Sequence, residues 1–232
     1  MFNALQNVLI PDAWQMEAIS ALRNGSDVII DAPTGAGKTF VFEKFVEGGA
    51  CGRKAYYTVP TRALANDKFA EWRSRGWRVG IMTGDVSYAT DSPVVVATLE
   101  AAQGALRDGG DARTVVIDEY QWIADPARGN HYEGAIISLP ISVQLLLLSG
   151  CVANPDEIGA WLRQLGREAR VVRHAERPVP IEEVDLDDLA RRPPSGITGY
   201  WPTRIAAALR DDLGPILVFA PHRQDAERLA RQ

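Results

Sequence analysis

The chain has 232 residues, of which 46% are hydrophobic and 24% charged, and its formal net charge is −5. This composition is long enough for one well-buried core and part of a second, and it excludes a chain that is disordered over most of its length. No charged leader followed by an apolar run opens the sequence, and the two cysteines, Cys51 and Cys151, lie far apart. We therefore expect a cytoplasmic protein with inert thiols.

Short apolar runs alternate with helix-compatible segments along the chain. The strand-like runs lie at residues 27–32, 55–60, 77–84, 94–100, 114–119, 143–150 and 169–174. Continuously apolar runs such as 145–148 suit strands that are covered on both faces. The pattern predicts an α/β fold in which helices flank a mainly parallel sheet.

The apolar stretch from Ala135 to Val152 is interrupted by Pro140 and Gln144. It therefore predicts a helix end followed by a buried strand, and not a membrane span. Asn154 and Pro155 then supply an N-cap and a first-turn proline to a helix that reaches about residue 166.

Changes in composition suggest where the chain divides. We expect a first domain at residues 1–176 and a connector rich in proline and acidic residues at 177–214. Residues 215–232 begin with an apolar run, which predicts a buried strand, and continue with a helical pattern. They resemble the start of a second domain that is not completed, so we expect this strand to dock on the first domain or to expose an apolar edge.

A glycine-rich loop joins the first strand-like run to a helix in the sequence VIIDAPTGAGKT. This pattern is typical of a phosphate-binding P-loop, because glycines let successive backbone amides face phosphate oxygens at a helix start. Lys38 is expected to neutralise the terminal phosphates and Thr39 to offer its hydroxyl to Mg²⁺. Ala32 stands where the general pattern has its first glycine. The residues expected to bind nucleotide here are Thr34, Gly35, Ala36, Gly37, Lys38 and Thr39.

The run at 114–119 delivers two adjacent carboxylates, Asp118 and Glu119, to the carboxyl end of a strand, where ligands bind in open α/β sheets. Asp118 is expected to hold Mg²⁺ and Glu119 to act as the base or to orient the attacking water. With Lys38 they form the predicted catalytic set. Paired carboxylates by themselves are usually surface charge, but a P-loop upstream favours the functional interpretation.

The positive charge is concentrated between Arg53 and Arg78, a segment with seven basic residues and only two acidic ones. Five aromatic residues interleave with them: Tyr56, Tyr57, Phe69, Trp72 and Trp77. Such a surface suits phosphates and bases. A solvated helix face over core aromatics explains the same pattern equally well.

Seven segments follow the motif order of a known motor family: PDAWQMEAI, APTGAGKT, PTRALAND, MTGD, ATLE, DEYQ and LLLLSGCVANPDEIGAWL. They resemble the Q motif and motifs I, Ia, Ib, Ic, II and III of superfamily 2 DExH-box helicases. The branch they most resemble contains the superkiller and exosome-cofactor RNA helicases and their archaeal DNA-helicase relatives. The resemblance covers nearly the whole chain and implies a RecA-like P-loop NTPase domain that uses ATP and Mg²⁺.

The resemblance also implies roles for individual residues. Gln15 would read adenine, and Gln121 and Ser149 would couple nucleotide state to strand movement. The residues that would line a track for single-stranded RNA or DNA are Thr61, Arg62, Thr83, Gly84 and Thr98. Two departures place coupling in doubt, because Gln121 replaces the usual histidine and Ser149-Gly150-Cys151 replaces serine, alanine, threonine. The three histidines show no metal-ligand spacing.

Three functions are compatible with these features. The leading one is the motor half of an ATP-dependent nucleic-acid helicase, with no membrane partner and with a second helicase domain supplied in cis by a longer protein. That second domain would contribute arginines to the γ-phosphate, so we expect this chain by itself to turn over slowly. The alternatives are a nucleotide-regulated nucleic-acid-binding module without effective coupling, and a small-molecule P-loop kinase, which explains the P-loop alone.

Overall fold

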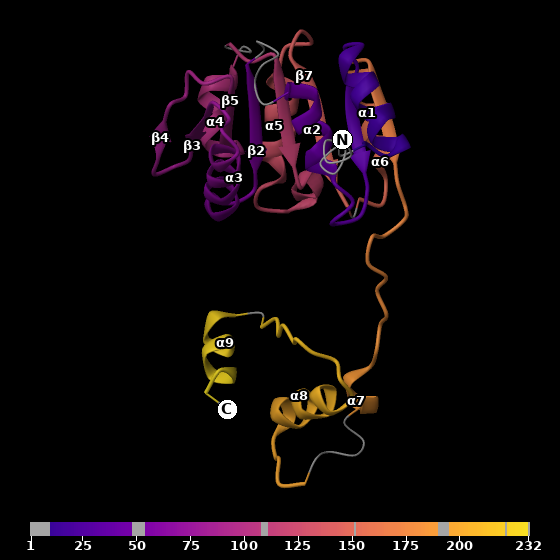
Figure 1. Ribbon diagram of the computed structural model, residues 1–232. Coiled ribbons are helices and arrows are strands. Elements are labelled where there is room, and N and C mark those ends of the chain that lie inside the picture. The colour runs from indigo at the N-terminus through magenta and orange to yellow at the C-terminus, as the bar shows by residue number, and fades with distance from the viewer. Residues whose placement is uncertain are drawn as a thin grey trace, which may run out of the picture. The chain divides into compact units, whose positions relative to one another are not determined.

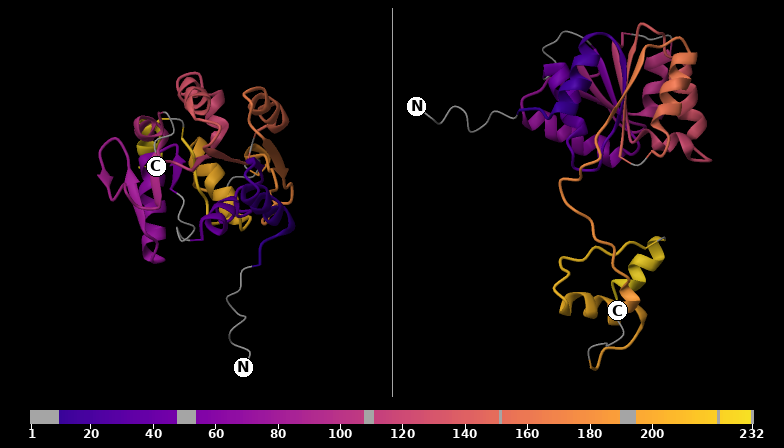
Figure 2. Two further views of the ribbon diagram at one scale, coloured as in Figure 1. Left: turned by 90° about the horizontal axis from the view of Figure 1, so that it is seen from above. Right: turned by 90° about the vertical axis from the view of Figure 1, so that its right-hand side faces the viewer.

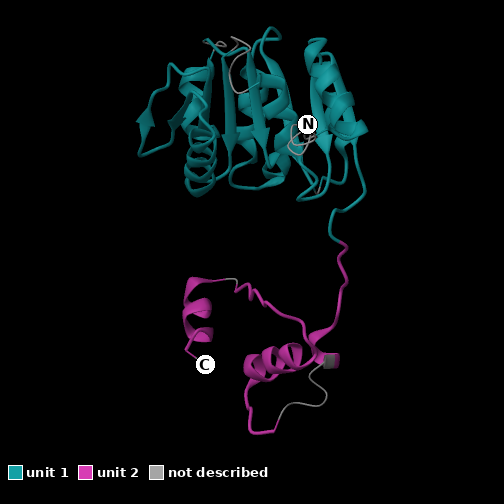
Figure 3. Cartoon of the chain, in the orientation of Figure 1, with its two compact units in different colours: residues 1–179 teal, residues 180–232 magenta. Residues whose placement is uncertain are grey.

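The computed structural model describes residues 10–47, 54–107, 111–150, 152–189, 195–220 and 222–231. The chain divides into two compact units, Met1–Val179 and Pro180–Gln232 (Figure 3). Cys51, Arg53 and Cys151 lie outside the described residues.

The first unit is built on one sheet, whose described strands follow the order β4-β3-β5-β2-β6-β7-β1-β8. The strands are β1 (Asp27–Asp31), β2 (Ala55–Val59), β3 (Val79–Met82), β4 (Ser87–Tyr88), β5 (Val94–Thr98), β6 (Thr114–Asp118), β7 (Gln144–Ser149) and β8 (Ala169–Arg173). Every pairing is parallel except that of β3 with β4. The predicted α/β class and mainly parallel sheet are confirmed.

Helices cover both faces of this sheet (Figures 1 and 2). One face carries α1 (Ala13–Arg23), α2 (Lys38–Val46) and α3 (Arg62–Ser74); the other carries α4 (Leu99–Leu106), α5 (Gly129–Ser138) and α6 (Pro155–Gln164). A hydrophobic core lies on each face of the sheet, and alternate strand residues point into one core or the other. In β1, Val28 and Ile30 face the first group of helices and Ile29 faces the second. This burial on both faces explains why the strands are apolar throughout.

A buried ion pair anchors the start of β1. The Asp27 carboxylate accepts hydrogen bonds from the Leu145 amide at 2.8 Å and from Arg167 at 3.0 Å. Arg167 also donates to the carbonyls of Leu139 and Val143 at 2.7 and 3.1 Å. Burial raises the pKa of Asp27, and these donors oppose the rise. The pair fixes β1 against β7 at the edge opposite to the P-loop.

Most elements lie where the sequence predicts them. All seven strand-like runs of the first domain form strands, and β4 is an eighth that the pattern did not indicate. The stretch from Ala135 divides into the end of α5 and β7, as predicted. Asn154 precedes α6, but its side chain makes no capping bond and donates to Glu157 at 2.6 Å. None of the helices in the described ranges has the length and apolar character that a bilayer crossing requires.

The second unit contains α7 (Leu186–Leu189), α8 (Tyr200–Arg210) and α9 (Arg223–Leu229), so two of its helices fall inside the segment predicted as a connector. Arg204 of α8 pairs with Asp187 of α7. The buried strand predicted at the start of 215–232 does not form: residues 216–220 have no regular structure, and Leu217 and Phe219 are 76% and 83% exposed. A strand needs a partner for its backbone groups, and no described strand lies in this unit.

Candidate functional site

The predicted site residues gather along one edge of the sheet, because the carboxyl ends of its parallel strands meet there. The P-loop comes directly after β1. Asp118 is the last residue of β6, Glu119 follows it, and Ser149 is the last residue of β7. These three strands are neighbours in the sheet. The ends of β2, β3 and β5, which carry the predicted nucleic-acid residues, are the adjacent half of the same edge.

The P-loop has the backbone geometry that its glycines allow. Gly35 and Gly37 have φ values of +84° and +88°, a left-handed conformation that other residues rarely adopt. Gly37 immediately precedes α2, so the first amides of that helix point into the loop. Ala32 is buried and its backbone amide bonds the Ser149 carbonyl at 3.1 Å, which extends the β1 to β7 ladder. Alanine is therefore tolerated where the general pattern has glycine.

Lys38 is held by its own loop in this structure. Its Nζ donates to the carbonyls of Ala32 at 2.7 Å and Pro33 at 3.1 Å. The sequence alone suggested no partner for this lysine except phosphate. A phosphate ligand would therefore compete with two backbone carbonyls for the ammonium group.

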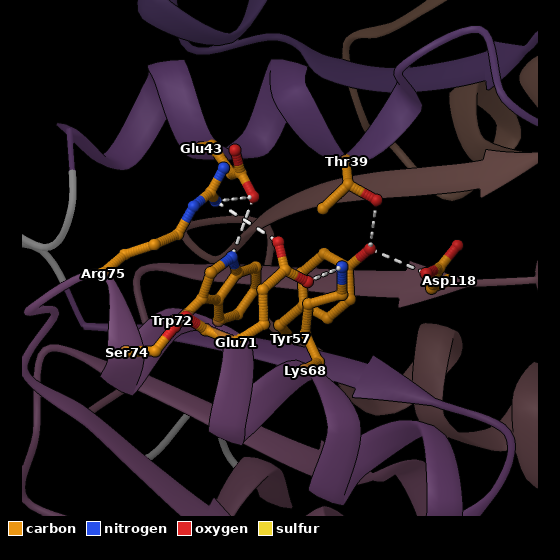
Figure 4. A network of polar contacts seen from close by, with 9 residues as sticks. All are labelled: Thr39, Glu43, Tyr57, Lys68, Glu71, Trp72, Ser74, Arg75 and Asp118. Carbon is orange, nitrogen blue, oxygen red and sulfur yellow. Dashed lines mark hydrogen bonds and ion pairs between the residues drawn. The ribbon is translucent and has the colours of Figure 1, made fainter.

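The two residues predicted to hold Mg²⁺ are bridged by a third side chain. The Tyr57 hydroxyl donates to Asp118 Oδ2 at 2.7 Å and lies 3.3 Å from Thr39 Oγ1 (Figure 4). Burial raises the pKa of Asp118; the Tyr57 hydrogen bond opposes the rise and the neighbouring Glu119 adds to it. Burial and then the Asp118 charge also raise the pKa of Tyr57 well above its usual value, so its hydroxyl stays protonated.

A second chain of hydrogen bonds joins β6 to β7. Ser149 Oγ donates to Gln121 Oε1 at 2.7 Å, and Gln121 Nε2 donates to Glu119 Oε2 at 2.7 Å. Glu119 has a φ of +56°, unusual for a residue with a side chain, and its amide donates to Asp118 Oδ1 at 3.0 Å. The structure thus brings together the two predicted coupling residues and the predicted base.

Gly150 lies against the P-loop. A Cβ atom at this position would be 2.9 Å from the Ala32 carbonyl oxygen, 3.2 Å from Lys38 Nζ and 3.3 Å from the Thr34 amide. A carbonyl oxygen of the backbone cannot give way as a flexible side chain does, so the absence of a side chain permits this approach. The glycine in motif III is therefore matched to the present position of the P-loop.

Gln15 is buried, with 6% of its surface exposed, and does not lie on an open helix face. Its Oε1 accepts from the Asp12 amide at 2.9 Å, and its Nε2 donates to the carbonyls of Ala36 and Gly37 at 3.2 and 3.4 Å. The same side chain thus caps α1 and contacts the P-loop.

A cavity of about 680 Å³ opens beside these groups, a size that suits a small ligand. Its lining includes Trp14 of α1, Gly35 of the P-loop and His174 after β8. The Trp14 and His174 rings, which both line the cavity, are stacked with centroids 5.2 Å apart.

The arrangement fits a nucleotide with a divalent cation. The hydroxyl of Thr39 and the carboxylate of Asp118 are hard oxygen ligands of the kind that Mg²⁺ prefers. Within the described ranges, no three His, Cys, Asp or Glu side chains gather as a metal cluster. A magnesium ion that is shared with phosphate oxygens needs only one or two protein ligands, which agrees with this donor set.

The predicted nucleic-acid residues differ in accessibility. Thr61, Arg62 and Gly84 are exposed, whereas Thr83 and Thr98 are 7% exposed. Thr61 Oγ1 accepts from the Leu64 amide at 3.3 Å and so caps α3, and Thr83 Oγ1 donates to Asp85 at 2.7 Å. Arg62 lies 3.6 Å from the Asp85 carboxylate, which brings the ends of β2 and β3 together.

The aromatic residues of the basic segment are mostly core residues. Tyr56, Tyr57 and Trp72 are buried, so they are not a surface on which bases stack. Trp72 Nε1 donates to Glu43 on α2 at 2.8 Å, and Lys68 and Arg75 pair with carboxylates (Figure 4). The interpretation as a solvated helix face over core aromatics is the better one for this segment. Arg62 lies apart from these pairs, at the first position of α3.

Two residues of the site were not singled out from the sequence for the contacts they make. Tyr57 belongs to the basic segment of the sequence, but it is paired in register with Val116, two residues before Asp118, and so faces the same side of the sheet. Arg128 donates to the Pro60 carbonyl at 2.9 Å and to Glu100 at 2.6 Å, and ties α4 to the loop before α3. Both contacts depend on strand order, which hydrophobic pattern does not reveal.

Similarity to known proteins agrees with this geometry. A family model described as DEAD/DEAH box helicase matches residues 12–158. The chain is 41% identical to "Probable helicase HelY" of Mycobacterium leprae (strain TN) over 177 residues, which are 73% of this chain and 19% of that protein. It is 35% identical to Superkiller complex protein 2 of Mus musculus over 188 residues, which are 77% of this chain and 15% of that protein. The chain thus spans about a fifth or less of the length of these relatives.

Solved structures share the fold. The DUF1998 helicase MrfA matches 97% of this chain and 38% of its own with a TM-score of 0.68 at 20% identity. The Hef helicase domain of Pyrococcus furiosus matches 72% of this chain and 38% of its own, with a TM-score of 0.56 at 19% identity. The resemblance drawn from the motifs is confirmed. Because the family model covers more than half of the sequence and its motifs line one edge of the sheet in the expected way, the chain belongs to the DEAD/DEAH box helicase family.

Proposed function

We propose that this chain is the ATP-binding motor half of an ATP-dependent nucleic-acid helicase, which binds MgATP and grips single-stranded RNA or DNA. The observation that carries the proposal is the convergence of Lys38, Thr39, Asp118 and Glu119 at the ends of neighbouring strands. A P-loop kinase requires the loop, but it does not explain the motif residues at the ends of β2, β3 and β5.

Each residue in this group has a distinct task in ATP hydrolysis. Lys38 leaves its loop carbonyls and places positive charge beside the terminal phosphates. Thr39 and Asp118 would hold a magnesium ion, which would neutralise charge that develops on the phosphate oxygens. Glu119 accepts the proton of the attacking water or orients that water, and Gln121 fixes its carboxylate through a 2.7 Å hydrogen bond.

Adenine selection falls to Gln15 in this proposal. Its side-chain amide has both a donor and an acceptor, which the edge of adenine requires, and the cavity beside it is large enough for a base. Because both ends of the amide are engaged with Asp12 and with loop carbonyls, a base must exchange at least one of these bonds.

Nucleic acid is gripped at the other half of the sheet edge in this proposal. Exposed Arg62 meets phosphate, and Gly84 and Thr61 allow backbone approach. Buried Thr83 acts through the turn that it holds with Asp85 and Val86, and buried Thr98 lies at the start of α4. Contacts to phosphate and sugar carry little sequence information, so binding is expected to be tolerant of sequence.

One observation favours a second candidate, a nucleotide-regulated binding module. The carboxylate of Glu119 is bonded to an amide at Gln121, which cannot exchange a proton as an imidazole does. In such a module ATP would order the chain without effective turnover. ATP hydrolysis that rises when single-stranded nucleic acid is added distinguishes the motor from the module.

Replacement of Lys38 tests the nucleotide site. We expect Lys38→Ala to abolish tight ATP binding and to leave the fold intact, because the lysine lies at the start of α2 and its hydrogen bonds described above go to carbonyls of the P-loop. Lys44→Ala is the matched control, since Lys44 is exposed on the same helix and lies over the Phe40 ring. Isothermal titration with ATP and Mg²⁺ measures both, and equal affinity in the Lys38 variant and the parent would contradict the assignment.

A further inference from the structure

The hydroxyl of Tyr57 is placed between the two side chains proposed to hold magnesium. Tyr57 is fully buried in β2, whereas Thr39 belongs to α2 and Asp118 ends β6. Its oxygen is 2.7 Å from Asp118 Oδ2 and 3.3 Å from Thr39 Oγ1 (Figure 4). Three elements that are far apart in the sequence therefore meet at one phenolic oxygen.

The direction of these hydrogen bonds follows from the inventory of donors. An ionised carboxylate only accepts, so the single Tyr57 proton goes to Asp118. The Thr39 hydroxyl must then donate its own proton to the Tyr57 oxygen. Consequently the lone pairs of Thr39 Oγ1 are left for another partner.

Asp118 keeps acceptor capacity in the same way. Its Oδ2 accepts from Tyr57 and its Oδ1 accepts from the Glu119 amide at 3.0 Å. A carboxylate has about four lone-pair sites, so two remain. The hydrogen bonds orient the group without saturating it.

The ring of Tyr57 is held firmly by its neighbours. It packs at 5.0 Å from the Phe42 ring and edge-on at 5.1 Å from Trp72. Trp72 is itself fixed by its bond to Glu43 on α2, the helix that follows the P-loop (Figure 4). A ring held on several sides cannot swing its hydroxyl away from the two ligands.

We propose that Tyr57 is a positioning residue of the magnesium site: its hydroxyl sets the orientation of Thr39 and Asp118, so that their free lone pairs face one ion. This inference rests on the proposed function, because it requires that the chain binds MgATP. Partners that orient metal ligands typically contribute tenfold to a hundredfold in metal affinity.

Tyr57→Phe tests the inference, because it removes the hydroxyl and keeps the ring. The full chain is titrated with a fluorescent, non-hydrolysable ATP analogue, first in EDTA and then at increasing MgCl₂. We expect the half-maximal Mg²⁺ concentration to rise by about tenfold to a hundredfold. Affinity for the analogue in EDTA should stay within about twofold of the parent, because the loop and Lys38 are unchanged.

Tyr56→Phe is the matched control. Tyr56 is the neighbouring residue on β2, is also buried, and its hydroxyl also meets a carboxylate, Asp111, at 3.4 Å. It faces the other core, away from the magnesium site, so its Mg²⁺ dependence should equal that of the parent. Thermal unfolding of both variants sets a common temperature, below the lower midpoint, at which binding is compared.

The outcomes separate the inference from the proposed function. A parent chain whose nucleotide affinity does not depend on Mg²⁺ overturns the proposed function. A parent that depends on Mg²⁺ and a Tyr57 variant with the same half-maximal concentration overturn the inference alone. Equal loss of affinity in EDTA and in MgCl₂ assigns Tyr57 a purely structural role and also overturns it.

Discussion

Asp118 lies in a setting that disfavours its own charge. Burial is the main cause of its raised pKa, and the charge of Glu119 adds to it. Because the folded-state pKa is above the ordinary value of 3.8, only at a pH between these two pKa values does the folded state hold a proton that the unfolded state releases. The stability that Asp118 contributes is therefore present below that value and is lost as pH rises through the folded-state pKa.

Asp118→Asn is expected to stabilise the fold while it removes Mg²⁺-dependent nucleotide binding. Asparagine mimics the uncharged acid, and the Tyr57 hydroxyl can accept as well as donate. The gain should be about 0.5–2 kcal/mol at neutral pH, the usual range when an unfavourable functional group is replaced. Urea unfolding as a function of pH measures it: the variant and the parent should coincide in acid and diverge as pH rises, and a gap that is constant with pH would contradict the explanation.

The sequence motifs identify some residues of the site and do not reveal others. Lys38, Asp118 and Glu119 follow strand-like runs, and the structure brings them to one place as the sequence predicts. Tyr57 gave no such signal, since an aromatic residue in a strand usually belongs to the core. Its role emerges only when β2 is seen to lie beside β6, and nothing in the pattern of a single strand specifies its neighbour.

Helix α3 presents its first residue to the predicted nucleic-acid track. Thr61 caps the helix, and Arg62 has 64% of its side chain exposed although Asp85 is nearby. Positive charge at this point is available to phosphate, because an exposed ion pair of this kind is weak.

Arg62→Ala should weaken binding to single strands of any sequence and reduce the salt dependence of log K by about one unit of slope. Lys68→Ala on the same helix removes the same charge from a lysine that pairs with Glu71 at 2.8 Å, and it should leave the slope nearly unchanged. Filter binding over a range of stated salt concentrations compares the two. Loss of discrimination at one base, with an unaltered slope, would show that Arg62 reads sequence instead.

Strands could be predicted from the sequence where their burial requires a recognisable apolar pattern. Strands β1, β2 and β5 to β8 are short apolar runs bounded by turns, and all of them form. The two residues of β4 are exposed and carry no such pattern. The run at 216–220 has the pattern, but the described residues of its unit include no partner strand, so local preference does not produce a strand.

The residues proposed to bind nucleotide and those proposed to bind nucleic acid lie on two halves of one edge of the sheet. Strands β6, β7 and β1 carry the proposed nucleotide residues, and β3, β5 and β2 carry those proposed for nucleic acid. The border between the halves is the β2 to β6 pair, where Tyr57 lies opposite Val116.

We expect this chain by itself to bind MgATP and to hydrolyse it slowly. In the proposed motor, arginines of a second helicase domain complete the site, and arginine fingers of this kind contribute about 10³ to 10⁵ in rate. Steady-state ATPase with saturating single-stranded RNA or DNA compares this chain with a version that carries a complete second domain. Turnover of the short chain at about 1 per second or faster would mean that the second domain is dispensable.

The two outer strands of the sheet in the first unit are protected from further pairing by different features. Strand β4 has only two residues, and β8 exposes Arg170 and Arg173. Very short and charged outer strands both resist pairing with another molecule. The run at 216–219 has no such protection, since Leu217 and Phe219 are open to solvent. Aggregation of this chain at high concentration is therefore expected to start from these four apolar residues and not from the sheet. Phe219→Lys should delay the rise in turbidity.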